Sequence, residues 1–398
     1  MRIAHVCLAA FYIDGFGYQE NILPRVHKAQ GHEVMVIAST ENYRGPERVY
    51  DDPRTYVNED GITVKRLAYA SWVPKRLAPK LRAYEDVTAS LEAFRPDLIF
   101  THDTQFWDLR KVARYAQAHD IPLVADCHTD YVNSARGFAS KHLLHGLLYR
   151  WIVRSSDHAI ARHWATLPAR ASFLQEMYGI DPAKIEILPF GVEDTGLDPA
   201  QRARLRADIR RDLGIGENDV VFVTGGKLDK RKNIHKLATR FSHLKNEGKL
   251  GNAHLVIFGK PDEETARLLD EVPRCDAIHR TGWAEAKDIS GLLLSGDVAF
   301  FPGTHSVLWE QAIGLGLPVV IHRWPGIDHL DKGGNTITIE RADDETLDGL
   351  LVTLSDPHNP MLEGLADAAR RVGPAHFAYT SIADRAVREW MPGSAAKV

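Results

Sequence analysis

The sequence predicts an α/β protein with two doubly wound domains that face each other across a central cleft. Its 398 residues exceed the roughly 250 to 300 at which one hydrophobic core stops growing. In both halves, short and nearly continuous apolar runs alternate with helical patterns, which is typical of parallel strands covered on both faces. Pro189, Gly191 and Gly196 then precede a charged stretch, as at a domain connection. We therefore expect domains at residues 1–191 and 192–375.

In the first domain, apolar runs of strand length are separated by segments of helical periodicity. The expected strands are residues 2–9, 33–39, 62–68, 97–103, 122–128 and 157–162. The expected helices are residues 18–30, 77–94, 106–119, 138–153 and 165–178.

The second domain repeats this alternation without repeating the sequence. Its expected strands are residues 220–226, 254–259, 277–281, 298–302, 319–323 and 335–340. A terminal helix at residues 376–391 is expected to pack back on the first domain. Open parallel sheets bind ligands at the carboxyl ends of their strands, so the loops that follow the strands are the places to look for function.

Composition excludes several classes of protein. The formal net charge of −4 argues against a nucleic-acid partner, because such domains are clearly basic. Cys7, Cys127 and Cys275 lie far apart, which argues against a disulfide framework or a thiolate zinc site and suits a reducing cytoplasm. No stretch reaches the roughly 18 apolar residues of a membrane span. We expect a cytoplasmic protein whose membrane contact, if it makes one, is peripheral.

The strongest local motif, residues 224–233, lies between an apolar strand and a helix. Gly225 and Gly226 let a backbone approach a ligand closely. Lys227 and Lys232 add positive charge, and a helix N-terminus favours anions. The motif therefore suits a diphosphate, although a solvated basic turn would contain the same residues. A P-loop is excluded, because GxxxxGK[ST] is absent.

A second motif, residues 301–318, again joins a strand, a tight loop and a helix. The helix is expected to begin near Ser306, which directs backbone amides toward a ligand. Glu310 and Gln311 then lie about one turn in, about 100° apart around the helix axis. The alternative interpretation makes Ser306 a plain cap, Trp309 a core residue and Glu310 a surface charge.

Together these two segments resemble the nucleotide-binding half of family 4 glycosyltransferases, which have the GT-B fold of two Rossmann-like domains. The resemblance covers nearly the whole chain and is strongest for bacterial enzymes of capsule, exopolysaccharide and O-antigen assembly. The matching residues are Gly226, Lys227, Leu228 and Lys232 for the diphosphate, Gly282 and Trp283 for the base, and Gly316 and Pro318 after the second motif.

One feature departs from that family, which usually carries two glutamates eight residues apart. Counting back from Pro318 places Gln311 and Gly303 at those positions. Two hypotheses stay open: Glu310 is displaced by one residue, or His305 and Gln311 replace the carboxylates.

The first domain also matches the family, at residues 16–21 and 31–34. By resemblance, His128 lies next to the donor sugar, and Gly17 belongs to the donor-binding loop. Tyr18, His102 and Asp130 are candidates for contacting the acceptor.

The resemblance implies transfer of a sugar from a nucleoside diphosphate sugar to a hydroxyl, with retention of configuration. Lys227, Lys232, Glu310 and His128 are the expected catalytic residues, and no metal or cofactor is expected. The acceptor would be a saccharide or a lipid-linked saccharide. Residues 72–82 and 141–154 mix cations with aromatic and aliphatic side chains, which suits an anionic membrane surface on the inner face of the plasma membrane, or equally a solvated helix.

Other functions fit the same fold. A sugar-nucleotide 2-epimerase would change the donor without any acceptor, and a pseudoenzyme would bind the donor without transfer. An NAD-dependent oxidoreductase is disfavoured, because no GxGxxG follows the first strand.

Overall fold

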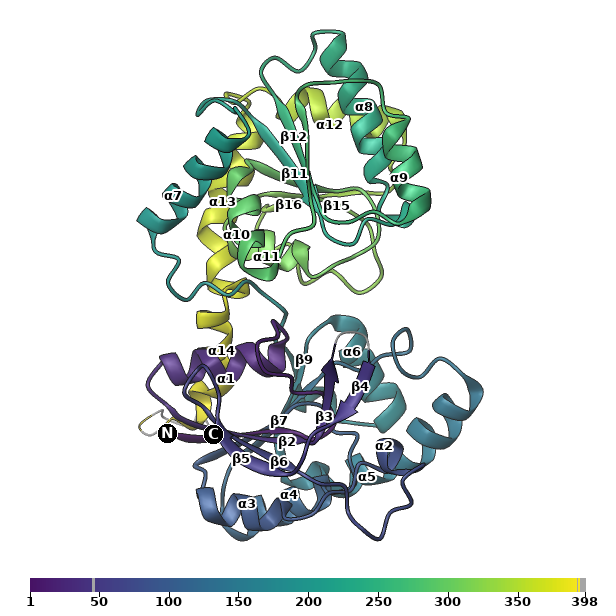
Figure 1. Cartoon of the computed structure of the whole chain (residues 1–398), viewed down its shortest axis with the longest axis vertical. Coiled ribbons are helices and arrows are strands. Elements are labelled where there is room, and N and C mark those ends of the chain that lie inside the picture. Colours follow the sequence, from purple (N-terminus) through teal and green to yellow (C-terminus); the bar gives the residue numbers. More distant parts are fainter. Residues whose placement is uncertain (45–46, 392, 394–398) are drawn as a thin grey trace. The chain divides into compact units, whose positions relative to one another are not determined.

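A computed structural model describes the chain except for residues 45–46, 392 and 394–398. The chain divides into two compact units (Figure 1). Unit 1 comprises Met1–Pro189 and the chain from Ala383 onward, and unit 2 comprises Phe190–Ile382.

Unit 1 is built on a sheet in the order β10-β9-β8-β7-β1-β2-β6-β5. Its strands are parallel except for β5, which pairs antiparallel with β6. Their bounds are β1 (Arg2–Cys7), β2 (Glu33–Ser39), β5 (Arg54–Val57), β6 (Thr63–Leu67), β7 (Leu98–Thr101), β8 (Leu123–Cys127), β9 (Ile160–Ala165) and β10 (Ile185–Ile187). A separate hairpin joins β3 (Glu41–Arg44) and β4 (Glu47–Tyr50).

Helices cover both faces of this sheet, with α1 and α14 on one face and α3, α4 and α5 on the other (Figure 1). The bounds are α1 (Gln19–Ala29), α2 (Ala78–Leu81), α3 (Val87–Phe94), α4 (Leu109–Ala118), α5 (Arg150–Ser156), α6 (Pro168–Phe173) and α14 (Tyr379–Val387). A π-helix, Ala139–Tyr149, leads into α5. The alternation of parallel strands and helices buries near-continuous apolar strands, as the sequence pattern predicts.

The helix expected at residues 77–94 is broken in two, and the expectation of one helix was wrong. Arg82 and Asp86 have φ values of 53° and 56°, which interrupt a right-handed helix. Between them the backbone is extended, because Tyr84 forms a β-bridge with Tyr69. Tyr84 is 2 % exposed, so burial of this aromatic ring outweighs the local helix propensity.

Unit 2 has a fully parallel sheet in the order β13-β12-β11-β14-β15-β16. Its strands are β11 (Val221–Gly225), β12 (His254–Phe258), β13 (Ile278–Gly282), β14 (Val298–Phe301), β15 (Val319–His322) and β16 (Thr336–Ile339). Its helices are α7 (Pro199–Asp212), α8 (Ile234–Asn246), α9 (Glu263–Asp270), α10 (Ala286–Ser295), α11 (Leu308–Gly314), α12 (Asp344–Leu354) and α13 (Pro360–Phe377).

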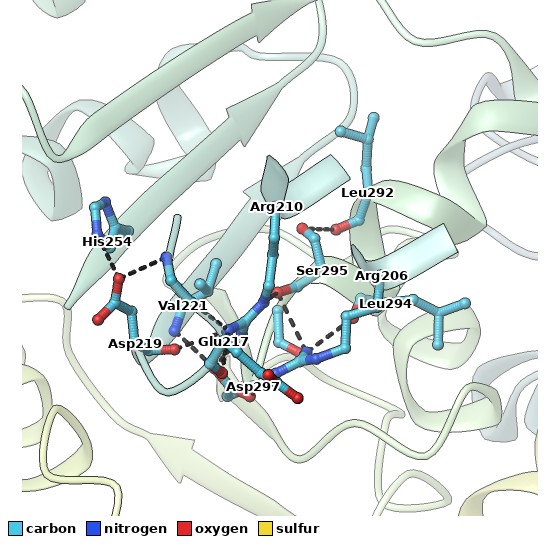
Figure 2. Close-up of polar contacts among 12 residues, drawn as sticks. Arg206, Arg210, Glu217, Asp219, Val221, His254, Leu292, Leu294, Ser295 and Asp297 are labelled. Atoms are coloured by element: carbon cyan, nitrogen blue, oxygen red, sulfur yellow. Dashed lines mark hydrogen bonds and ion pairs between the residues drawn. The ribbon is translucent and has the colours of Figure 1, made fainter. Parts of the chain in front are cut away.

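The charged stretch after Gly196 is helix α7, and two of its arginines tie it to unit 2 (Figure 2). Nη2 of Arg206 contacts one carboxylate oxygen of Asp297 at 2.5 Å, and Nη2 of Arg210 contacts the other at 2.7 Å. Arg210 also donates to the carbonyls of Gly216, Glu217 and Asp219, each at 3.0 Å. A guanidinium has five N–H donors, so one buried arginine closes the loop that leads into β11.

Each sheet has a topological switch point, where neighbouring strands send their connections to opposite faces. In unit 1 the switch lies between β1 and β7, and in unit 2 it lies between β11 and β14. Doubly wound sheets bind ligands in the crevice at the carboxyl ends of such strands. The loops after these four strands therefore define the candidate functional site in each unit.

Candidate functional site

In unit 2, the two sequence motifs follow the two strands of the switch point, β11 and β14. Gly226 has a φ of +103°, and a Cβ on it would lie 2.8 Å from the Leu308 side chain. A Cβ on Gly303 would lie 2.2 Å from the Arg231 carbonyl oxygen. Glycine is required at both positions, because any side chain would push the two loops apart.

Lys232 links the two loops directly. Its ammonium donates to the carbonyl oxygens of Thr304 at 2.7 Å and His305 at 3.0 Å. Burial lowers its pKa to about 8, so the lysine is still mostly charged at neutral pH. Lys227 differs: it is exposed, and its ammonium makes no ion pair within the described part of the chain.

Glu310 lies beneath the second loop and is fully buried. Its carboxylate contacts His305 Nε2 at 2.9 Å, and His329 Nε2 lies 3.5 Å away. Burial alone would raise the pKa of Glu310, but the two imidazoles outweigh it and lower that pKa to about 2. The alternative that made Glu310 a surface charge was therefore wrong, whereas Trp309 is fully buried as a core residue.

The other predicted residues of unit 2 lie around these loops. Helix α11 begins at Leu308, and Ser306 Oγ accepts from the Leu308 amide at 3.3 Å. Gln311 Oε1 is buried and has no hydrogen-bond partner among the described residues. At the end of β13, Gly282 has a φ of +77°, and Trp283 is 71 % exposed.

In unit 1, His128 follows β8 and lies beside Asp126, the fourth residue of that strand. His128 Nε2 is 3.1 Å from Asp126 Oδ2, and His102 Nδ1 is 2.7 Å from the same oxygen. The other oxygen of Asp126 accepts from the Asp103 amide at 2.8 Å. Asp103 in turn accepts from the His128 amide at 3.1 Å, so the loops after β7 and β8 are joined by their own carboxylates.

These contacts determine the charges of His128 and Asp126 at the carboxyl end of β8. Burial disfavours a charge on His128, but the Asp126 carboxylate, with Glu20, outweighs it and raises the pKa of His128 to about 9. Burial likewise disfavours a charge on Asp126, yet His128 and His102 lower its pKa well below the usual range. At neutral pH, His128 is therefore a cation paired with a buried anion.

The nitrogen and oxygen atoms of His102, Asp126 and His128 lie within 4.8 Å of one another, and such atoms can bind metals. In the structure the same atoms contact each other directly, at 2.7 and 3.1 Å, so the Asp126 carboxylate is the partner of one nitrogen of each histidine.

The acceptor candidates of unit 1 differ in accessibility. Tyr18 is 54 % exposed and is the N-cap residue of α1. At Gly17, next to it, an added Cβ would have no other atom within 4 Å. Asp130 accepts from the amides of its own loop, Val132 and Asn133, at 2.8 Å. His102 is fully buried, and both of its ring nitrogens are engaged.

Sequence reasoning missed several buried polar groups at the unit 1 switch point. The side-chain amide of Gln19, the Thr104 hydroxyl and Gln105 Nε2 have no hydrogen-bond partner among the described residues. Buried polar atoms are normally paired, so these atoms offer hydrogen bonds that a polar ligand or water can take up. The signal was present in the run of polar residues that follows the apolar strand β7.

Comparisons with known proteins now identify the family. The family model described as Glycosyl transferase 4-like domain matches residues 25–191, and the model Glycosyl transferases group 1 matches residues 217–356. The chain is a glycosyltransferase of the family 4 type. No curated protein matches this glycosyltransferase. Within the described chain, no helix is both long and apolar enough to cross a membrane.

Solved structures confirm the GT-B fold that was predicted for the glycosyltransferase. A glycosyltransferase from Rickettsia africae has 12% sequence identity and a TM-score of 0.67, with 98% of this chain and 97% of that chain covered. HepE from Anabaena, solved with UDP and glucose, has 15% identity and a TM-score of 0.62, with 98% of each chain covered. A UDP-N-acetylglucosamine 2-epimerase homologue from Listeria monocytogenes has 13% identity and a TM-score of 0.57, with 98% of this chain and 95% of that chain covered.

Proposed function

We propose that this glycosyltransferase moves a sugar from a nucleoside diphosphate sugar to a hydroxyl of a saccharide or lipid-linked saccharide. It would retain the configuration, need no metal or cofactor, and act in the assembly of a bacterial cell-surface polysaccharide. The observation that carries the proposal is the pair of glycine loops at the unit 2 switch point, cross-linked by Lys232. HepE, which shares the fold, was solved with UDP and glucose.

Lys232 is well placed to meet the diphosphate. An ammonium has three N–H donors, and the carbonyls of Thr304 and His305 take two of them. The third remains for an anion, and the exposed Lys227 adds a second cation from the same loop. As the bond from the sugar to the diphosphate breaks, negative charge builds up on the leaving group. Cations that are already in place stabilise that charge without reorganisation.

The His305–Glu310 pair supports a further part of this proposal, the replacement of the family's missing glutamates. Glu310 has no exposed surface, whereas the His305 side chain is 16% exposed. We infer that His305 contacts the donor and that Glu310 acts through it. The buried Glu310 carboxylate, 2.9 Å from His305 Nε2, orients this imidazole at the donor site.

In unit 1, His128 is proposed to face the donor sugar. Its raised pKa makes it a charged hydrogen-bond donor, which suits an oxygen that gains negative charge in the transition state. The unpartnered atoms belong to Gln19, the first residue of α1, and to Gln105, on the connection that follows β7. Gly17 and Tyr18 belong to the loop between β1 and α1, and we assign this loop to substrate contacts.

A lipid-linked acceptor is supported by an aromatic and basic surface on unit 1. The ring centroids of Trp72 and Trp107 lie 6.0 Å apart, and those of Trp107 and Trp151 lie 5.6 Å apart. Arg110 lies between Trp107 and Trp151, with its guanidinium carbon 4.1 and 4.2 Å from the two ring centroids. The two segments singled out in the sequence therefore meet on one surface. The exposed apolar residues of the two segments include Trp72, Leu77, Leu143, Leu147 and Trp151.

Such a surface suits the interface of an anionic membrane, where aromatic rings and cations bind together. We propose peripheral contact with the inner face of the plasma membrane. Flotation with phosphatidylglycerol vesicles should recover the protein at low salt and lose it at high salt. Trp151→Ser should weaken binding, whereas Trp324→Ser, which removes a 40% exposed tryptophan of unit 2, should not. Equal recovery on neutral and anionic vesicles would contradict the proposal.

The test of the transferase itself begins with the donor. Isothermal calorimetry against UDP, GDP, dTDP and their sugars should give heat with one base, and Lys232→Ala should weaken that heat. Lys236→Ala, an exposed lysine on α8, is the matched control. No heat with any activated sugar would overturn the proposal. Conversion of the donor sugar without an acceptor, followed by NMR, would identify a 2-epimerase, and binding without conversion or transfer would identify a pseudoenzyme.

A further inference from the structure

Four histidines and one aspartate form a continuous line of contacts through the core of unit 1. His27 Nε2 contacts the carbonyl oxygen of Ala383 at 2.9 Å, and His27 Nδ1 contacts His5 Nε2 at 3.0 Å. His5 Nδ1 contacts His102 Nε2 at 3.0 Å. The contacts of His102 and His128 with Asp126 Oδ2 complete the line. It runs from α14, through α1, β1 and the end of β7, to the edge of the sheet at His128.

The carbonyl at one end fixes the direction of the hydrogens. A carbonyl oxygen only accepts, so His27 Nε2 must carry the hydrogen of that bond. Burial lowers the pKa of His27 to about 4 and lowers that of His5 well below 6.5. Both imidazoles are therefore neutral, with one hydrogen each. His27 Nδ1 then has none and accepts from His5 Nε2, and His5 Nδ1 accepts in turn from His102 Nε2.

The contact with Asp126 determines which nitrogens of His102 carry a hydrogen. Its Nε2 hydrogen is committed to His5, and its Nδ1 lies 2.7 Å from a carboxylate oxygen of Asp126. An ionised carboxylate only accepts, so Nδ1 must carry a hydrogen as well. We propose that His102 is doubly protonated and, by donating to Asp126, is a positioning residue that holds the carboxylate toward His128. This inference rests on the function proposed for His128.

Other ionisable groups act on this line without reversing it. Asp103 and Glu20 act on His128 and favour its charged form. His32 opposes and Asp384 favours a charge on His27. The line contains two cations, at His102 and His128, and one anion at Asp126. Of these charged groups in the line, only His128, with a side chain 16% exposed, reaches the surface.

The positions of the imidazole hydrogens can be measured by NMR, without an assay of enzymatic activity. In protein labelled with 15N-histidine, each imidazole signal is assigned by its loss in a single variant. We expect His5 and His27 to carry hydrogen on Nε2 only, and His102 to carry it on both nitrogens. His27→Leu removes the imidazole that accepts from His5 Nε2. His5 can then carry its hydrogen on Nδ1 and donate it to His102, so His102 should lose the Nε2 hydrogen. An unprotonated nitrogen on His102 in the unmodified protein would overturn the proposal.

Two variants of His102 separate positioning from structural support. The amide nitrogen of Asn lies near the position of Nδ1, so His102→Asn keeps a donor to Asp126 and loses the bond to His5. The longer His102→Gln keeps the bond to His5 and loses the donor to Asp126. We expect His102→Asn to transfer sugar within about threefold of the unmodified rate and His102→Gln to lose tenfold or more in kcat, with little change in donor KM.

A structural role would predict equal losses in the two variants, and that result would overturn the positioning role. His163→Asn is the control, because it breaks another buried histidine–aspartate contact, with Asp157 at 2.8 Å, outside the line. Should the protein transfer no sugar at all, the proposed function fails, and the NMR measurement still decides the hydrogen positions.

Discussion

Replacing Asp126 by Asn should flatten the dependence of stability on pH in the alkaline range. Despite burial, Asp126 and its acidic neighbours raise the pKa of His128 from 6.5 to about 9. An imidazole with a higher pKa in the folded state stabilises the fold fully below pH 6.5, and this stabilisation is lost as the pH rises through about 9. In the unmodified protein, the free energy of unfolding should therefore decline across this window.

The size of the effect follows from the pKa difference. A rise from 6.5 to about 9 corresponds to about 3 kcal/mol, at 1.36 kcal/mol for each pKa unit. Asp126 is the largest attractive contribution to His128, so Asp126→Asn should remove most of the decline. Lys232 has the opposite effect on the pH dependence of stability. Burial lowers its pKa to about 8, so its charged form destabilises the fold at lower pH, and this destabilisation decreases as the pH rises above about 8. The same lysine is present in both proteins, so the difference between their profiles cancels it.

The assay is urea denaturation from about pH 6 to about pH 9, followed by tryptophan fluorescence. Hydrogen-exchange mass spectrometry of peptides from β8 assigns the transition to unit 1. His128→Gln removes the titrating group itself and should give the same flat profile as Asp126→Asn. A decline as steep in Asp126→Asn as in the unmodified protein would refute the assignment of the His128 pKa to this carboxylate.

Three further substitutions test the rest of the structure. Lys232→Ala should lower turnover by about 10²-fold at saturating donor, the scale of one lost charge-stabilising group; near-normal turnover would contradict its role. Glu310→Gln removes the carboxylate that orients His305 through the 2.9 Å contact with its Nε2 and should cost about tenfold in turnover; a rate equal to that of the unmodified protein would contradict this role. Arg210→Ala removes one of the two arginines that contact Asp297. It also leaves the carbonyls of Gly216, Glu217 and Asp219 without this donor, and it should destabilise unit 2 by about 3 kcal/mol in urea. The exposed Arg211→Ala, by comparison, should leave the stability nearly unchanged, because exposed ion pairs contribute little.

Most of the parallel strands were predictable because they are buried apolar runs with their own sequence signal, whereas the three-residue parallel strand β10, Ile185–Ile187, was not predicted. For example, the strand expected at residues 33–39 is β2, Glu33–Ser39. The hairpin β3–β4 and strand β5 were not predicted, because their residues are largely polar and exposed, with a pattern that does not differ from that of a loop. Tyr84 shows a second limit, since the contact that breaks the expected helix is a bridge to Tyr69, which no local propensity encodes.

The candidate site was predictable to the extent that its residues are contiguous in sequence. Lys232 was singled out from its own motif, but its bonds to carbonyls 72 and 73 residues away appear only in the fold. The same holds for the line of histidines, in which His5 meets partners 22 and 97 residues away. His5 and His27 stand within an apolar strand and an amphipathic helix, where a single histidine carries no signal of its partner.

The candidate sites at the two switch points share one arrangement of charged side chains. In unit 2, His305 is supported by the buried carboxylate of Glu310, and in unit 1, His128 is supported by the buried carboxylate of Asp126. In both, a buried carboxylate contacts a partly exposed imidazole beneath a strand–loop junction. A side chain that is fixed in this way needs little reorganisation when an anionic leaving group forms. On the proposed function, the carboxylate would act from inside the protein through the histidine, and the histidine would take the place of the family's glutamate pair at the ligand.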